Sequence, residues 1–208
     1  PEGLAYDILY DTTESVRASV KEVFKTLLIT FTLVVLVTWL FLGDWRATLI
    51  PAVAIPIALI GVMSVLFAFG LNLNMITLFA LILAIGIVVD DAIIVVENTQ
   101  RLIDQADARS LDRKQLAIDS MRQLTTPVIA TTLVLLAIFV PVAFMPGITG
   151  ELYRQFAITL SFAVVLSSLT ALTLSPAMCA LLLRPSAQAL QSPLSRFSPA
   201  RPFGKGLE

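Results

Sequence analysis

Residues 75–97 read MITLFALILAIGIVVDDAIIVVE, an apolar stretch that carries two adjacent acids, Asp90 and Asp91. On insertion scales, one charged residue at the centre of a bilayer costs roughly 2.5–3.5 kcal/mol, and two neighbouring carboxylates also repel each other. Acidic residues are therefore rare in membrane spans, where they usually mark the path of an ion or a proton. This pair directs the interpretation of the whole chain.

The rest of the 208-residue chain supplies a membrane setting for the pair. Hydrophobic residues make up 57% of the sequence and charged residues only 14%, whereas a soluble domain carries about 25% charged residues. A helix needs about 17–25 residues to cross a bilayer. Apolar blocks near that length predict an all-α membrane protein, a bundle of about five transmembrane helices with spans near residues 26–43, 48–70, 75–97, 125–145 and 155–183.

Three segments outside these spans differ in character. Residues 1–25 predict a linker and then an amphipathic helix, capped by Thr12 or Thr13, that runs into the first span. Residues 98–124 are rich in charge and predict a loop with a short surface helix. Residues 185–208, rich in Ser, Pro and Ala, predict a disordered or truncated tail.

Local signals refine the ends of the spans. Asn72 and Asn74 are expected to cap the third span. Glu97 and Arg101 stand four residues apart at its other end and could pair there. Pro127 is expected near the first helical position of the fourth span.

The distribution of Lys and Arg predicts the orientation. Ten of the basic residues fall on the side of residues 43–47, 98–124 and 184–208, and four fall on the other side. Cytoplasmic segments carry the excess of Lys and Arg. We therefore expect residues 98–124 and 185–208 to be cytoplasmic and the N-terminal segment to lie outside.

The composition narrows what the acidic pair could do. The chain has no histidine and a single cysteine, Cys179, which we interpret as an apolar packing residue. No Lys or Arg lies in the middle of a span, so a static buried ion pair lacks a partner within this sequence. Carboxyl groups whose charge changes during a cycle would carry protons. Asp90 and Asp91 point about 100° apart on a helix, and the small residues Ala80, Ala84 and Gly86 would let neighbouring helices approach closely.

The motifs around the pair resemble those of one family. Residues 86–98, GIVVDDAIIVVEN, closely resemble the fourth transmembrane helix of resistance-nodulation-division (RND) efflux pumps, in the branch that exports hydrophobic and amphiphilic compounds. YDTT at 10–13 resembles the linker before the second span of that family, and RATLIP at 46–51 resembles the start of its third. YRQF at 153–156 and SPAMC at 175–179 resemble the borders of its sixth span.

This resemblance implies a proton-driven multidrug antiporter of the bacterial inner membrane. It implies that Asp90 and Asp91 relay protons, with Glu97, Asn98 and Arg101 as possible relay or helix-end support. It also implies a homotrimer with a periplasmic adaptor protein and an outer-membrane channel, and a basic partner for the aspartates in a second repeat of the membrane domain. The chain would correspond to the second to sixth helices of the first repeat, with its N-terminus in the periplasm.

The resemblance also implies no enzyme activity, cofactor or metal, with protons as the coupling ion. Several alternatives remain. The chain could be a non-transporting structural remnant, one half of a membrane bundle, or part of a proton-driven protein-export motor of the same superfamily. An intramembrane aspartyl protease would need its aspartates on facing helices, and a metal or cation channel would need ligand rings that this sequence lacks. No basic stripe with interleaved aromatic residues indicates nucleic acid.

Overall fold

Five long helices make up the structure, a computed structural model that describes residues 12–71, 74–106 and 112–185. They are α1 (Thr12–Leu42), α2 (Trp45–Ala68), α3 (Met75–Gln105), α4 (Arg113–Val142) and α5 (Ile148–Leu182). Each helix is long and apolar enough to cross a membrane. The described ranges contain no strand, so the predicted all-α membrane fold is confirmed.

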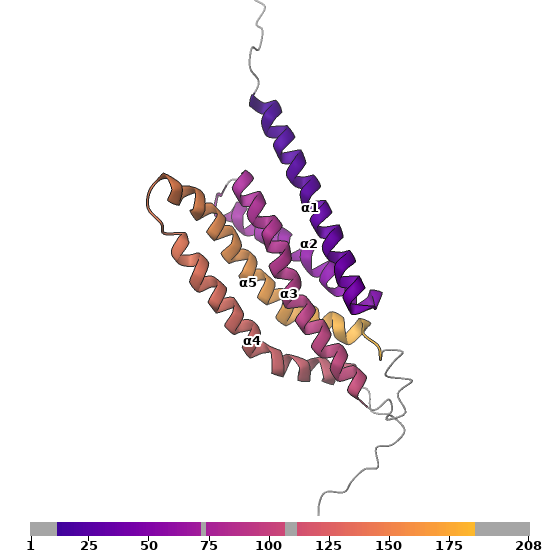
Figure 1. Cartoon of the computed structure of the whole chain (residues 1–208). Helices are drawn as coiled ribbons and strands as arrows, with labels where there is room; N and C mark the ends of the chain where they lie inside the picture. The colour runs from indigo at the N-terminus through magenta and orange to yellow at the C-terminus, as the bar shows by residue number, and fades with distance from the viewer. Residues whose placement is uncertain (1–11, 72–73, 107–111, 186–208) are drawn as a thin grey trace, which may run out of the picture.

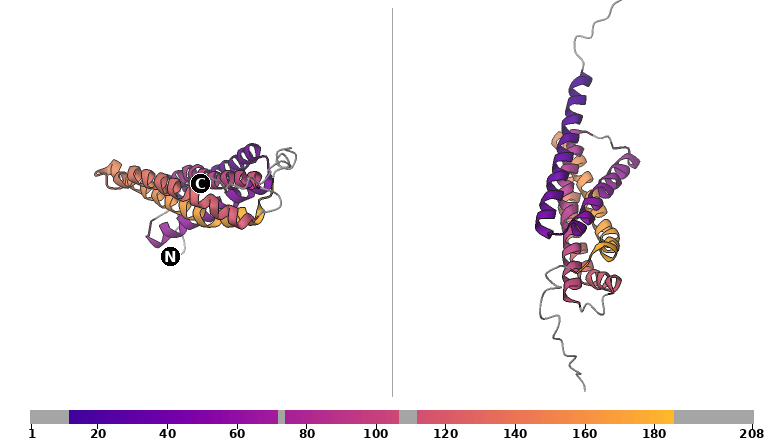
Figure 2. Two further views of the ribbon diagram at one scale, coloured as in Figure 1. Left: turned by 90° about the horizontal axis from the view of Figure 1, so that it is seen from below. Right: turned by 90° about the vertical axis from the view of Figure 1, so that its right-hand side faces the viewer.

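The helices form a flattened bundle in which the chain runs up and down in turn (Figure 1). α3 lies at the centre, with α1 toward one edge and α4 at the other. Seen from below, the bundle is much wider than it is thick (Figure 2). α1 contacts α2 and α3, whereas α4 contacts α3 and α5. Because the helices alternate in direction, α3 and α5 are parallel neighbours.

Short-range polar bonds set where the helices begin. Asp44 accepts from the Arg46 backbone N–H at 2.9 Å and starts α2. Asn74 forms a capping box with Thr77 at the start of α3, as expected, and Asp112 caps α4. Asn72, and the side chains of Thr12 and Thr13, lie outside what the structure describes.

The polar segment between the third and fourth spans is mostly helical. α3 continues to Gln105 and α4 already begins at Arg113, so the expected surface helix and the fourth span are one helix. The expectation that Pro127 lies near a helix start is wrong, because it sits inside α4. α4 changes direction in its first half (Figure 1). Proline removes the hydrogen bond to the carbonyl four residues earlier, and this loss bends a helix without ending it.

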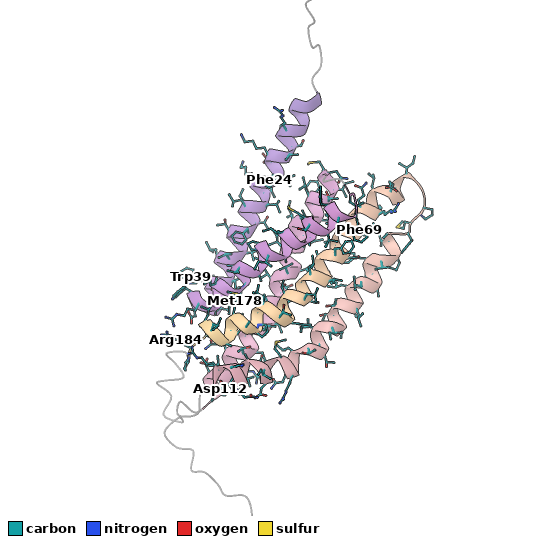
Figure 3. All side chains as sticks on the ribbon, turned by 180° about the vertical axis from the view of Figure 1, so that it is seen from behind. Phe24, Trp39, Phe69, Asp112, Met178 and Arg184 are labelled. Carbon is teal, nitrogen blue, oxygen red and sulfur yellow. The ribbon has the colours of Figure 1, made fainter. Side chains whose placement is uncertain are left out.

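Two apolar clusters hold the helices together. The larger joins α1, α2, α3 and α5 around fully buried residues that include Val62, Leu81, Ile85 and Leu160. The smaller lies nearer the end of the bundle where α5 finishes, around Ile50, Val96 and Cys179. Cys179 is buried there as a packing residue. Large apolar side chains also point outward along the helices, among them the labelled Phe24, Trp39 and Phe69 (Figure 3).

Candidate functional site

Asp90 and Asp91 lie near the middle of α3, the central helix of the bundle (Figure 1). Because successive residues on a helix are rotated by about 100°, the two carboxyl groups leave the helix in different directions. Asp91 is half-buried, whereas Asp90 is exposed. The two acids therefore occupy different surroundings although they are neighbours in the sequence.

Asp91 is held by α5. The Ser167 hydroxyl donates to Asp91 Oδ2 at 2.5 Å, and Ser167 itself is 0% exposed. Five of the residues one turn away on the two helices are apolar and buried, namely Val88, Val95, Ala163, Val164 and Ala171. A hydrogen bond in such low-dielectric surroundings is electrostatically stronger than one in water. Asp91 is thus oriented toward α5.

Asp90 lies on a different face of α3, with no bonding partner among the residues that the structure describes. No hydrogen bond or ion pair joins it to another residue of the described ranges. Its neighbours at helical spacing are exposed as well. We call this stripe the open face of α3, consisting of Phe79, Leu83, Gly86, Asp90, Ile94 and Glu97.

The small residues before the pair divide between the two faces. Ala80 and Ala84 are fully buried and pack within the bundle. Gly86 lies on the open face, where an added Cβ would meet nothing within 4 Å. The close helix approach expected at Gly86 is therefore not made by any helix described here. Part of the helix surface around Asp90 is left for something outside the described bundle.

The predicted support residues at the end of α3 join it to α4. Asn98 Nδ2 donates to Ser120 Oγ at 2.9 Å, and Arg101 Nη2 donates to Asn98 Oδ1 at 2.7 Å. The expected ion pair between Glu97 and Arg101 does not form. Glu97 is exposed on the open face, seven residues beyond Asp90. Asn98 and Arg101 thus fix helix packing at a distance from the acids.

The charges of the described residues leave the acidic pair uncompensated. Salt bridges join Lys25 to Glu22, Arg122 to Asp119 and Arg154 to Glu151. Each of these lies within one helix and is largely exposed, and none involves the pair. No group of three or more metal-ligating side chains occurs in the same ranges. A cation that pairs with Asp90 would have to approach from beyond these helices, along the open face.

Sequence reasoning did not find Ser167. A serine within an apolar span carries no signal by itself, because hydroxyl groups commonly bond to the carbonyl four residues earlier. Ser161 does so with Ala157. Ser167 and Ser168 are adjacent and both buried, and Ser168 bonds to Thr132 of α4. The two adjacent serines within one apolar span were the sequence signal that this part of α5 contacts other helices on two sides.

The fold and the site together define a multi-pass helical membrane protein with an acidic pair inside its central helix. Intramembrane acids that face an interior or a partner are typical of ion and proton paths. The chain belongs to the AcrB/AcrD/AcrF family, whose sequence model matches residues 1–204. The RND membership that the motifs predicted is confirmed.

Curated relatives cover nearly the whole chain. The multidrug export protein AcrF of Escherichia coli K12 is 46% identical over 185 residues, which is 89% of this chain and 18% of that protein. The multidrug resistance protein MdtC of Pectobacterium atrosepticum is 44% identical over 88% of this chain and 18% of its own length. The solvent-resistant pump membrane transporter SrpB of Pseudomonas putida is 42% identical over 88% of this chain and 17% of its own length. The chain spans less than a fifth of the length of these relatives.

Proposed function

We propose that this chain supplies part of the membrane domain of a proton-driven exporter of hydrophobic and amphiphilic compounds, in which Asp90 and Asp91 carry the coupling protons. The observation that carries the proposal is the placement of the pair. One carboxyl is held inside the bundle by Ser167, while the other lies on the open face of α3, where no basic side chain of the described residues pairs with it. The family membership gives this placement its context.

The placement suits a proton carrier for electrostatic reasons. Away from water, a carboxyl group without a positive partner favours its neutral, protonated form, and an approaching cation favours the ionised form. A basic side chain that moves toward and away from the open face would therefore release and reload a proton at each cycle. In this proposal the cation comes from a second membrane repeat, and its approach is coupled to drug movement. No cofactor is required.

The substrate class follows from the relatives. AcrF and MdtC are named for multidrug export and resistance, and SrpB for solvent resistance. Drugs and solvents that one class of pump exports are organic compounds that are apolar or amphiphilic. The same kinship is the reason for proposing a homotrimer in the inner membrane that works with a periplasmic adaptor and an outer-membrane channel. The surrounding lipid would cover the outward-facing apolar side chains.

The test uses a chimera of E. coli AcrF in which residues 12–185 of this chain replace the matching segment. Asp90→Asn and Asp91→Asn each keep the side-chain shape and remove a titratable proton. Each should abolish efflux of a fluorescent drug from cells while expression and trimer assembly stay normal. Glu97→Gln, on the same open face, is the matched control and should retain efflux. Full efflux by either aspartate variant would show that the pair is structural.

A second proposal is that these 208 residues do not transport by themselves. It is favoured by the small share of the relatives that the chain spans. The chain would then act as an assembly half, and the purified chain in proteoliposomes with a pH gradient should move no drug. Drug accumulation that depends on the gradient would contradict this proposal. The names of the relatives refer to drug export and drug resistance. They favour part of a drug exporter over part of a protein-export motor.

The proposed orientation follows the excess of basic residues on one side, with residues 98–124 cytoplasmic and the N-terminus periplasmic. In a Cys179→Ala background, Ser110→Cys should resist an impermeant thiol reagent added to intact cells, whereas Leu71→Cys should react. The reverse labelling pattern would overturn this orientation.

A further inference from the structure

The bond between Ser167 and Asp91 is one of several polar bonds that join the parallel helices α3 and α5. Nearer the start of α3, the Asn74 side chain bonds to Gln155 of α5. Beyond the acids, Gln100 Nε2 donates to the Arg184 carbonyl, just past the end of α5, at 2.9 Å. These bonds join uncharged groups on either side of the acidic pair. They keep the two helices in register, so Ser167 stays opposite Asp91 whether or not the two residues are bonded.

The hydroxyl group suits an acid that changes its protonation state. An ionised carboxylate can only accept hydrogen bonds, whereas a protonated carboxyl can also donate, and a serine hydroxyl can do either. When Asp91 is ionised, Ser167 donates to it, and the distance of 2.5 Å between Ser167 Oγ and Asp91 Oδ2 fits such a bond. When Asp91 is protonated, the direction of the bond can reverse without movement of either helix. The contact can therefore persist in both states.

Asp90 has no such contact. It lies on the open face and bonds to no other residue of the described ranges. A carboxyl group there can change its orientation and its partner freely. The adjacent hydroxyl, Ser168, points elsewhere and bonds to Thr132 of α4. The bond to Ser167 thus distinguishes Asp91 from Asp90. It also differs from the other bonds between α3 and α5, because it involves an acidic side chain.

We propose that Ser167 is a positioning residue that fixes the Asp91 carboxyl toward α5 in both of its protonation states, which makes Asp90 the member of the pair that changes partner. The proposal deepens the proton-carrying function proposed above and rests on it for its purpose. The orientation itself can be measured without any transport.

The experiment is infrared difference spectroscopy, at acid against neutral pH, on the full 208-residue chain in lipid nanodiscs. One acid of the pair is removed at a time. Asp90→Asn leaves the Asp91 carboxyl to be followed, and Asp91→Asn leaves the Asp90 carboxyl. In the Asp90→Asn background, Ser167→Ala should shift the C=O band of protonated Asp91 to higher wavenumber, because the carboxyl loses a hydrogen bond. In the Asp91→Asn background, the same change should leave the Asp90 band in place.

Two controls separate positioning from general disturbance of the bundle. Ser167→Thr keeps the hydroxyl and should leave the Asp91 band where it is. Ser168→Ala removes a buried hydroxyl one residue away and should also leave it unchanged. Circular dichroism and a monodisperse gel-filtration peak verify the fold. If Ser167→Ala does not fold, Ser167→Cys replaces it and should give a smaller shift of the same sign, because a thiol is a weaker donor.

An Asp91 band that does not move in Ser167→Ala overturns the proposal, as does an equal shift in Ser168→Ala. A shift of the Asp90 band in Ser167→Ala also overturns it, since the hydroxyl would then serve both acids. The function proposed above fails on a different result, namely efflux by the Asp90→Asn or Asp91→Asn chimeras. The two failures are therefore distinguishable.

Discussion

The two faces of α3 differ in burial and in the contacts that their side chains make. The packed face consists of Ala84, Ile85, Val88, Ala92 and Val95, which are 2% exposed or less. The open face carries Asp90 and Glu97 among half-exposed apolar residues. One acid lies on each face, since Asp91 bonds to Ser167 while Asp90 forms no hydrogen bond or ion pair within the described bundle. One face of α3 therefore builds this bundle, and the other is available to a partner.

The largest predicted effect is a difference in unfolding free energy between substitutions on the two faces. Ile85→Ala would leave a cavity on the packed face and should cost about 2 kcal/mol of unfolding free energy in mixed micelles. Between helices and lipid the hydrophobic effect contributes little, so this cost reflects lost packing. Leu83→Ala on the open face is the matched control and should stay within about 0.5 kcal/mol. Equal losses at the two positions would show that both faces are packed.

A smaller effect is predicted for transport by the AcrF chimera. Ser167→Ala should lower the efflux rate at saturating drug by roughly tenfold, the size expected when a charged group loses one hydrogen bond. The drug concentration that gives half the maximal rate should change little, because Ser167 does not contact drug in this account. Ser168→Ala should keep at least half of the rate. A changed half-saturating concentration with an unchanged maximal rate would indicate that Ser167 acts in drug binding and not in proton transfer.

Hydropathy and spacing predicted much of this molecule. The five spans, the Asn74 cap and the acidic pair follow from local composition, because lipid selects long apolar helices whatever their partners are. The start of α4 did not follow, since polar residues near water can continue a helix and Pro127 only bends it. The bond between Asp91 and Ser167 joins residues 76 positions apart. It depends on how α3 and α5 align side by side, which no local pattern encodes.

The exposure of Asp90 was equally hidden from the sequence. Asp90 and Asp91 have the same side chain and almost the same neighbours, so composition treats them alike. Their difference arises from the rotation of one residue on the helix and from where α5 packs. A helix face without a partner becomes visible only when the neighbours of α3 are placed.

The most direct test of the central claim is chemical cross-linking between the acid positions and Ser167. In a Cys179→Ala background of the chain in nanodiscs, Asp91→Cys with Ser167→Cys should be joined by a short bifunctional thiol cross-linker. Asp90→Cys with Ser167→Cys should not be joined, because position 90 faces away from α5. Cross-linking of the 90–167 pair at the same rate as the 91–167 pair, or of neither pair, would contradict the division of the two acids between the two faces of α3.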